Sequence, residues 1–143
     1  NGAWRHAVLT YAGTSLAAGV LMYGDGAAIG MNTLANTLTG TIQNAHAFEI
    51  GSQDGGGFFI GHLDEVAVYD KVLSAAEVPA LYNGGAVIDY TTLASAANLV
   101  GYWRMAEDST FPSIPDISSS GNDATMLNMQ QFGPTRSRVL RPP

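Results

Sequence analysis

Phe48 to Tyr82 reads FEIGSQDGGGFFIGHLDEVAVYDKVLSAAEVPALY, and this segment carries the strongest structural signal in the chain. A strand after Phe48 is predicted to end in a glycine loop, and a second strand is predicted over residues 63–69. Ser74 and Glu77 have the spacing of a capping box, in which two residues exchange hydrogen bonds at the start of a helix. The segment therefore predicts strand, turn, strand and short helix.

The residues before this segment predict a β-hairpin and a long loop. Residues 4–11 alternate in the manner of a strand with two partly apolar faces. A second strand, residues 19–23, runs into Gly24-Asp25-Gly26, and Asp-Gly is a strong turn signal because glycine accepts a positive φ. We expect the extra Gly24 to form a bulge. Residues 30–46 are rich in Thr and Asn and predict an extended loop.

Two sets of motifs resemble laminin-G-like, concanavalin A-like lectin and glucanase domains. The LDEVAVY and LSAAE motifs of residues 63–77 resemble the closing segment of that family, and the hairpin resembles its Trp-x-His and Asp-Gly pattern. LVGYW, residues 99–103, and the loop of residues 116–125 resemble the family's opening, with Ala124 in place of the usual glycine. The resemblance implies an all-β fold, an antiparallel β-sandwich of the jelly-roll type with one or two short helices.

The motifs occur in an unusual order, because the closing motif comes before the opening motif. The chain is cut across two tandem domains, or is circularly permuted, or its closing half recruits the Tyr-Trp strand. The last two predict one sandwich over residues 1–134, in which residues 63–69 pair antiparallel with residues 99–105. Isolated half-sandwiches would leave long unpaired edges, which favours these two. Strand alternation and the helix face predict the core residues Trp4, Val8, Val66, Val68, Leu81 and Trp103.

The composition describes a folded acidic domain of 143 residues with no cysteine. Its net charge of −6 argues against nucleic acid as the main partner. No apolar run approaches the roughly 20 residues that span a membrane, so no membrane partner is expected. The chain begins at Asn1 without methionine, so its start is expected to have been lost by processing or truncation.

Half of the basic residues lie in the last eight positions. Residues 135–143 therefore form a basic C-terminal tail, which is either a solvated terminus or an arm that docks on an acidic neighbour. In the second case its contacts with another subunit come from Arg136, Arg138, Val139, Leu140 and Arg141.

The sequence does not carry an enzyme's constellation, so no catalytic residue is expected. A retaining glycosidase needs two carboxylates about 5 to 5.5 Å apart. Asp64 and Glu65 are adjacent, so a strand would point them to opposite faces. The histidines at positions 6, 46 and 62 lack the spacing of zinc ligands, and a structural role is expected for each.

Two kinds of binding remain open. Calcium prefers clustered oxygen ligands, and Asp116, Asn122 and Asp123 flank a serine-rich loop that could supply them, although Asp and Asn also cap turns. No other cofactor is expected. Phe58 and Phe59 could stack on sugar rings, although aromatic residues in strands usually face a core.

These observations lead to two readings of function. The joined pattern from Leu81 to Met129 is similar to segments of tailed-phage virion proteins, which favours a virion structural or decoration protein. Its partners would be identical subunits or other virion proteins. The alternative is a carbohydrate-binding, lectin-like module of a secreted or cell-surface protein.

Overall fold

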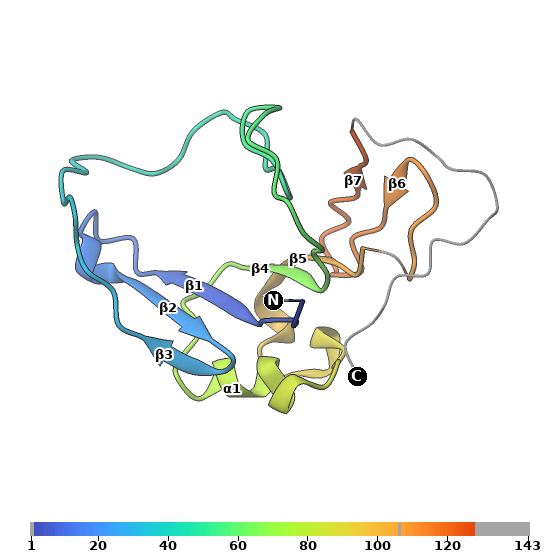
Figure 1. Ribbon diagram of the computed structural model, residues 1–143, viewed down its shortest axis with the longest axis horizontal. Helices are drawn as coiled ribbons and strands as arrows, with labels where there is room; N and C mark the ends of the chain where they lie inside the picture. Colours follow the sequence, from blue (N-terminus) through green and yellow to red (C-terminus); the bar gives the residue numbers. More distant parts are fainter. Residues whose placement is uncertain (1, 106, 128–143) are drawn as a thin grey trace.

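The computed structural model describes residues 2–105 and 107–127, and their strands form three antiparallel sheets (Figure 1). The first sheet has the order β1-β2-β3, the second pairs β4 with β5, and the third pairs β6 with β7. The strands are β1 (Ala7–Tyr11), β2 (Val20–Gly24), β3 (Ala27–Ile29), β4 (Val66–Tyr69), β5 (Leu99–Trp103), β6 (Ser113–Ile114) and β7 (Ala124–Thr125). The α-helix is α1 (Glu77–Tyr82), and the 3₁₀ turns are η1 (Ala17–Gly19), η2 (Asn83–Gly85), η3 (Tyr90–Thr92) and η4 (Ala96–Asn98). This is the predicted fold class: mostly antiparallel strands with one short helix.

The first sheet confirms the predicted hairpin and its Asp-Gly turn. Asp25 and Gly26 have φ angles of 49° and 79°, the left-handed pair that a two-residue hairpin turn needs. The predicted bulge is wrong, because Gly24 pairs in regular register with Ala7 and with Ala27. The first strand begins at Ala7 rather than at residue 4, because the chain turns at Asp25 and Gly26, and the last backbone bond on this side, from the Asp25 amide, reaches only the His6 carbonyl.

The second sheet confirms the predicted pairing of two distant segments. β4 runs antiparallel to β5, with Val66 opposite Trp103 and Ala67 opposite Tyr102. A bulge lies between Val68 and Tyr69. β4 begins later than predicted, since Glu65 has a φ of 53° and so leaves the extended conformation.

The helix begins with the predicted capping box. The amide of Ser74 donates to the Glu77 carboxylate at 2.8 Å, and the Glu77 amide donates to the Ser74 hydroxyl at 3.3 Å. Lys71 adds an ion pair to the same carboxylate at 2.6 Å. The helix ends at Asn83, whose φ of 47° is the left-handed conformation typical of a C-terminal cap.

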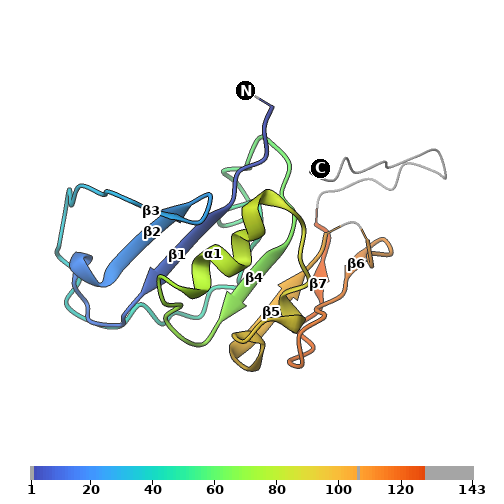
Figure 2. The same ribbon diagram turned by 90° about the horizontal axis from the view of Figure 1, so that it is seen from below.

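The core lies on one face of the strands, where α1 covers them (Figure 2). Of the predicted core residues, Leu81 and Trp103 are buried, whereas the other four are only partly buried. Val8 packs against the core and is only partly covered there, whereas Val66 and Val68 alternate with core-facing Ala67 and Tyr69 and so point to the opposite face. Trp4 precedes β1 and is only partly covered. The buried hydrophobic residues are Tyr23, Leu73, Val78, Leu81, Tyr90, Leu99, Tyr102 and Trp103.

Residues 30–62 form an arch that curves away from the strands on the side opposite α1 (Figure 1). The extended loop predicted for residues 30–46 is confirmed. The strand predicted after Phe48 is not formed, and the segment holds only an isolated bridge between Gln53 and Gly56. The segment has no neighbouring strand to pair with, so its apolar residues stay exposed.

We predict that Trp103→Ala lowers the free energy of unfolding by about 3 to 5 kcal/mol, as expected for a buried aromatic residue. Trp103 is buried, its indole donates to the Asn122 carbonyl at 2.9 Å, and Phe48 stacks on it. Leu9→Ala on the exposed face of β1 is the control and should change stability by less than about 0.5 kcal/mol. Urea unfolding measures both, and equal midpoints for the two variants would contradict a stabilising role of the buried Trp103.

Candidate functional site

The serine-rich loop of residues 116–123 is organised around the carboxylate of Asp116. Oδ1 accepts from the amides of Tyr102 at 2.8 Å and Ser118 at 2.9 Å, and Oδ2 accepts from the Asn122 amide at 2.8 Å and the Ser118 hydroxyl at 2.9 Å. Asp123 in turn accepts from the Asp116 amide at 2.9 Å. Burial alone would raise the pKa of Asp116, but these hydrogen bonds outweigh it and lower the pKa.

The structure thus brings the three predicted calcium ligands together, with most of their oxygens used by the protein's own donors. Asn122 donates its side-chain amide to the Val100 carbonyl at 2.8 Å and accepts from Trp103 through its backbone. Within residues 2–105 and 107–127, no group of three or more His, Cys, Asp or Glu side chains is placed to hold a metal ion. The described geometry is that of a capped turn, and calcium binding here stays a prediction.

The predicted sugar-stacking residues lie on the arch and are open to solvent. Phe58 is 61% exposed and Phe59 is 57% exposed. The carboxylate of Glu49 shapes their glycine loop by accepting from the Ser52 hydroxyl at 2.5 Å and from the Gly55 amide at 3.2 Å. Two exposed phenyl rings could contact a ligand, which core aromatic residues such as Tyr102 could not.

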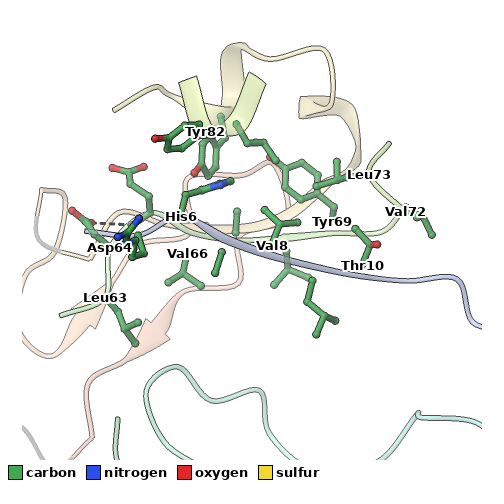
Figure 3. A pocket seen from close by; sticks show the side chains of 18 of the residues that line it. His6, Val8, Thr10, Leu63, Asp64, Val66, Tyr69, Val72, Leu73 and Tyr82 are labelled. Carbon is green, nitrogen blue, oxygen red and sulfur yellow. Dashed lines mark hydrogen bonds between the residues drawn. The ribbon is translucent and has the colours of Figure 1, made fainter. Parts of the chain in front are cut away.

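A cleft that was not predicted from the sequence lies between two of the strands. It is an open cleft of about 1620 Å³ between β1 and β4, bounded by α1 on one side and by the arch on the other. Figure 3 shows Val8 and Val66 in its wall, with Tyr82 of α1 above them. Small-molecule pockets are usually about 300 to 1,000 Å³. The greater size and open form of this cleft suit a length of polypeptide better than a small ligand.

Polar groups gather at one end of the cleft. Asp25 accepts from Arg5 at 2.5 Å and from the His6 amide at 3.0 Å. The His6 ring lies 5.7 Å from that of Tyr82, and its Nδ1 is buried without a hydrogen-bond partner. Burial lowers the pKa of His6 although the charge of Asp25 acts in the opposite direction. His6 is therefore a neutral wall residue at pH 7.

A second polar cluster joins the start of β4 to the end of β5. The Tyr102 hydroxyl donates to Glu65, and the Tyr102 ring stacks on Tyr90 with centroids 4.8 Å apart. Arg104 lies 3.8 Å from Glu65 and forms ion pairs with Glu107 and Asp108. Burial, together with the hydrogen bond and charge of Glu65, raises the pKa of Tyr102. The hydroxyl is thus a neutral donor that holds a carboxylate in place.

These positions bear on the catalytic question. Asp64 accepts from the Glu65 amide at 3.0 Å, and the Glu65 side chain is held by Tyr102. Each carboxylate has its own protein partners, and the absence of a catalytic residue stays a prediction. From the sequence, Glu65 was considered only with its neighbour Asp64, and its bond to Tyr102 was missed because that residue is 37 positions away.

The predicted subunit-contact residues Arg136, Arg138, Val139, Leu140 and Arg141 lie outside the described residues. Within the part of the chain that is described, no helix has the length and apolar character needed to cross a bilayer.

A laminin G family model, described as the concanavalin A-like lectin/glucanases superfamily, matches residues 1–79, which is more than half of the chain. The chain belongs to this superfamily. The matched region includes the β1–β2–β3 sheet, the arch and β4, and it ends inside α1. No curated protein and no solved structure matches the chain.

Membership of the concanavalin A-like superfamily accounts for the hairpin and for the Asp-Glu-Val strand, and it leaves β5 to β7 outside the matched region. The Asp116 loop lies beyond the family match, as do Tyr102 and Arg104 of the second polar cluster, whereas its Glu65 lies inside it. The cleft, in contrast, is formed mostly by residues inside it.

We predict that Asp116→Asn costs about 1.5 to 3 kcal/mol of stability at pH 7, because a charged acceptor of several hydrogen bonds is lost. The pKa of Asp116 is lowered in the folded state, so its contribution is present above the ordinary value of 3.8 and is lost as the pH falls below it. The parent should therefore lose more stability than Asp116→Asn on acidification. Urea unfolding from pH 7 to pH 2.5 measures this.

The control for this pH series is Asp54→Asn, whose parent side chain is 74% exposed. It should follow the parent's pH dependence closely. Parallel curves for the parent and Asp116→Asn would contradict the stabilising role of the ionised Asp116.

Proposed function

We propose that this chain is a structural or decoration protein of a phage-like virion, which uses its laminin-G-like jelly roll for contacts between subunits. The observation that carries the proposal is the apolar surface of the arch, where Leu34 is 99% exposed and Ile60 is 98% exposed. Monomeric soluble proteins rarely expose large contiguous apolar patches, and those that do usually bind a partner there.

The size of this surface fits a protein partner. The exposed large apolar residues of the arch are Met31, Leu34, Leu38, Ile42, Phe48, Phe58, Phe59 and Ile60. At on the order of 100 Å² each they offer roughly 800 Å², about one partner's share of a standard interface. The basic tail, residues 135–143, adds a second element of contact on an otherwise acidic chain. Both elements favour identical subunits or other virion proteins as partners.

The virion assignment rests on the similarity of the joined pattern to tailed-phage virion segments, and on a chain without cysteine, which needs no oxidising compartment to fold. In this proposal the protein acts by surface complementarity, without a catalytic residue or a cofactor. Its location is the extracellular particle.

We predict that the protein self-associates with a dissociation constant that rises with salt, because ion pairs of the tail contribute. Each exposed pair adds only about 0.2 to 1 kcal/mol, so several must act together. Deleting residues 135–143 should weaken association at least tenfold and leave the melting temperature nearly unchanged. Sedimentation equilibrium and thermal unfolding measure the two effects, and a deletion that unfolds the domain would show the tail to be part of its core.

The second candidate function is that of a lectin-like module of a secreted or cell-surface protein. The exposed rings of Phe58 and Phe59 favour it, because sugars stack on aromatic faces that water can reach. In that case the protein should bind a glycan as a monomer.

We predict for this alternative that Phe58→Ala and Phe59→Ala abolish binding on a glycan array. Leu34→Ala, on the same arch, is the matched control. Binding that is lost on chelation and in Asp123→Ala would place calcium at the 116–123 loop. An array without hits, together with salt-sensitive self-association, would favour the virion role.

A further inference from the structure

Two strands of the structure have a free edge facing the same cleft. Among the described residues, β1 pairs only with β2, and β4 pairs only with β5. In both ribbon views β1 lies between β2 and β4, so the unpaired side of β1 is turned toward the unpaired side of β4 (Figures 1 and 2). Residues of both strands line the cleft.

The hydrogen-bond pattern shows which backbone groups are available on β1. The Asp25 amide donates to the His6 carbonyl, and the Ala12 amide donates to the Gly19 carbonyl, each at 2.9 Å. In an antiparallel pair, alternate residues bond to the partner and the residues between them point away. The amides and carbonyls of Ala7, Leu9 and Tyr11 therefore point toward the cleft.

The same argument applies to β4. The amide and carbonyl of Tyr102 bond to Asp116 and Ile117, on the side of β5 away from β4. Ala67 is opposite Tyr102, so their pair is of the type that is not hydrogen-bonded. The backbone groups of Ala67 thus also point to the free edge.

The separation of β1 and β4 leaves the space between them open to an additional strand. Neighbouring strands lie about 4.8 Å apart, so a strand inserted between two others separates them by roughly 9.6 Å. Most Cα–Cα distances between β1 and β4 exceed 8 Å, whereas the paired strands β1 and β2 approach one another along their length. The walls between them are apolar and only half-buried, with Val8 on one side and Val66 and Val68 on the other.

The charges along the cleft define what the strand should carry. Asp64 precedes β4 and Asp70 follows it, and the apolar residues of the strand lie between them. Six residues of extended chain span roughly 20 Å. Two basic side chains of the lining are already bound to carboxylates, Arg5 to Asp25 and Lys71 to Glu77. A complementary segment is therefore apolar in its middle and basic toward its ends.

Residues 135–141 have this pattern. They read TRSRVLR, with Val139 and Leu140 between arginines, and Arg136 and Arg141 are five residues or roughly 17 Å apart when extended. Pro134 and Pro142 border the segment, so each of its seven residues has an amide to donate to a sheet.

We propose that residues 135–141 of a second copy of this chain enter the cleft as a strand between β1 and β4. Val139 and Leu140 contact its apolar walls, and the flanking arginines pair with Asp64 and Asp70. The inference rests on the proposed function, whose contacts between subunits it places at a specific site. Reciprocal exchange of tails closes a dimer, and exchange in one direction builds a ring or a filament.

Cysteine cross-linking tests this contact directly, because the chain contains no cysteine. Ala7→Cys on the free edge of β1 and Val139→Cys in the tail are made in separate full-length proteins, which are mixed under mild oxidation. The matched control is Ala28→Cys, an exposed alanine on the opposite edge of the same sheet. We expect disulfide-linked pairs of the Ala7→Cys and Val139→Cys chains at several times the yield of the Ala28→Cys mixture, and a several-fold decrease at 1 M salt.

Equal yields with Ala7→Cys and Ala28→Cys, or no cross-link at all, would overturn the proposal. The same holds if a chain carrying both Ala7→Cys and Val139→Cys closes on itself at high dilution, because its own tail would then fill the cleft. The variant Val139→Asp tests the same contact without any introduced cysteine. It should weaken self-association at least tenfold. If Val139→Asp leaves the dissociation constant of self-association unchanged, the cleft contact is overturned and the proposed function stands. If the protein stays monomeric at every concentration, both are overturned.

Discussion

Tyr102 joins four segments of this structure that are distant in sequence. Its side chain is fully buried, its backbone bonds to Asp116 and Ile117, its hydroxyl donates to Glu65, and its ring stacks on Tyr90. Through these contacts one residue of β5 fixes the serine-rich loop, the start of β4 and the 3₁₀ turn η3. Because all of these partners are distant in sequence, the structure around β5 depends on long-range packing more than on local preference.

Local preference explains the parts that the sequence predicted well. The Asp25-Gly26 turn and the Ser74–Glu77 capping box each place the required atoms within a few residues, so the sequence contains the whole interaction. The pairing of β4 with β5 was predicted from the family resemblance rather than from local signals. It holds although the two motifs occur in the reverse of the family's order.

The rest could not be read from the sequence, for physical reasons that differ from place to place. Alternation identified Val66 and Val68 as core residues, but it cannot tell whether a second layer covers their face, and here that face opens into the cleft. Phe48 is of a residue type that favours strands, but it has no neighbouring strand to bond with. It therefore remains in the arch and stacks on Trp103. The Asp116 loop was recognised as a cluster of oxygen ligands, whereas the donors that satisfy it come partly from β5.

Among the described residues, the cleft lies between two strand edges that have no partner strand, those of β1 and β4. A free edge can pair with any other chain, and proteins usually limit this with short or charged edges. β3, the other edge of the first sheet, has only three residues and so offers little to a foreign strand. β1 has five residues, but its free edge is turned toward that of β4 and lies between α1 and the arch.

A whole sheet cannot approach either strand there, because it would collide with the other. A single extended segment can pair with both at once, and the carboxylates of Asp64 and Asp70 at the ends of β4 favour one that carries positive charge. The geometry that leaves these edges open therefore also restricts what can bind to them.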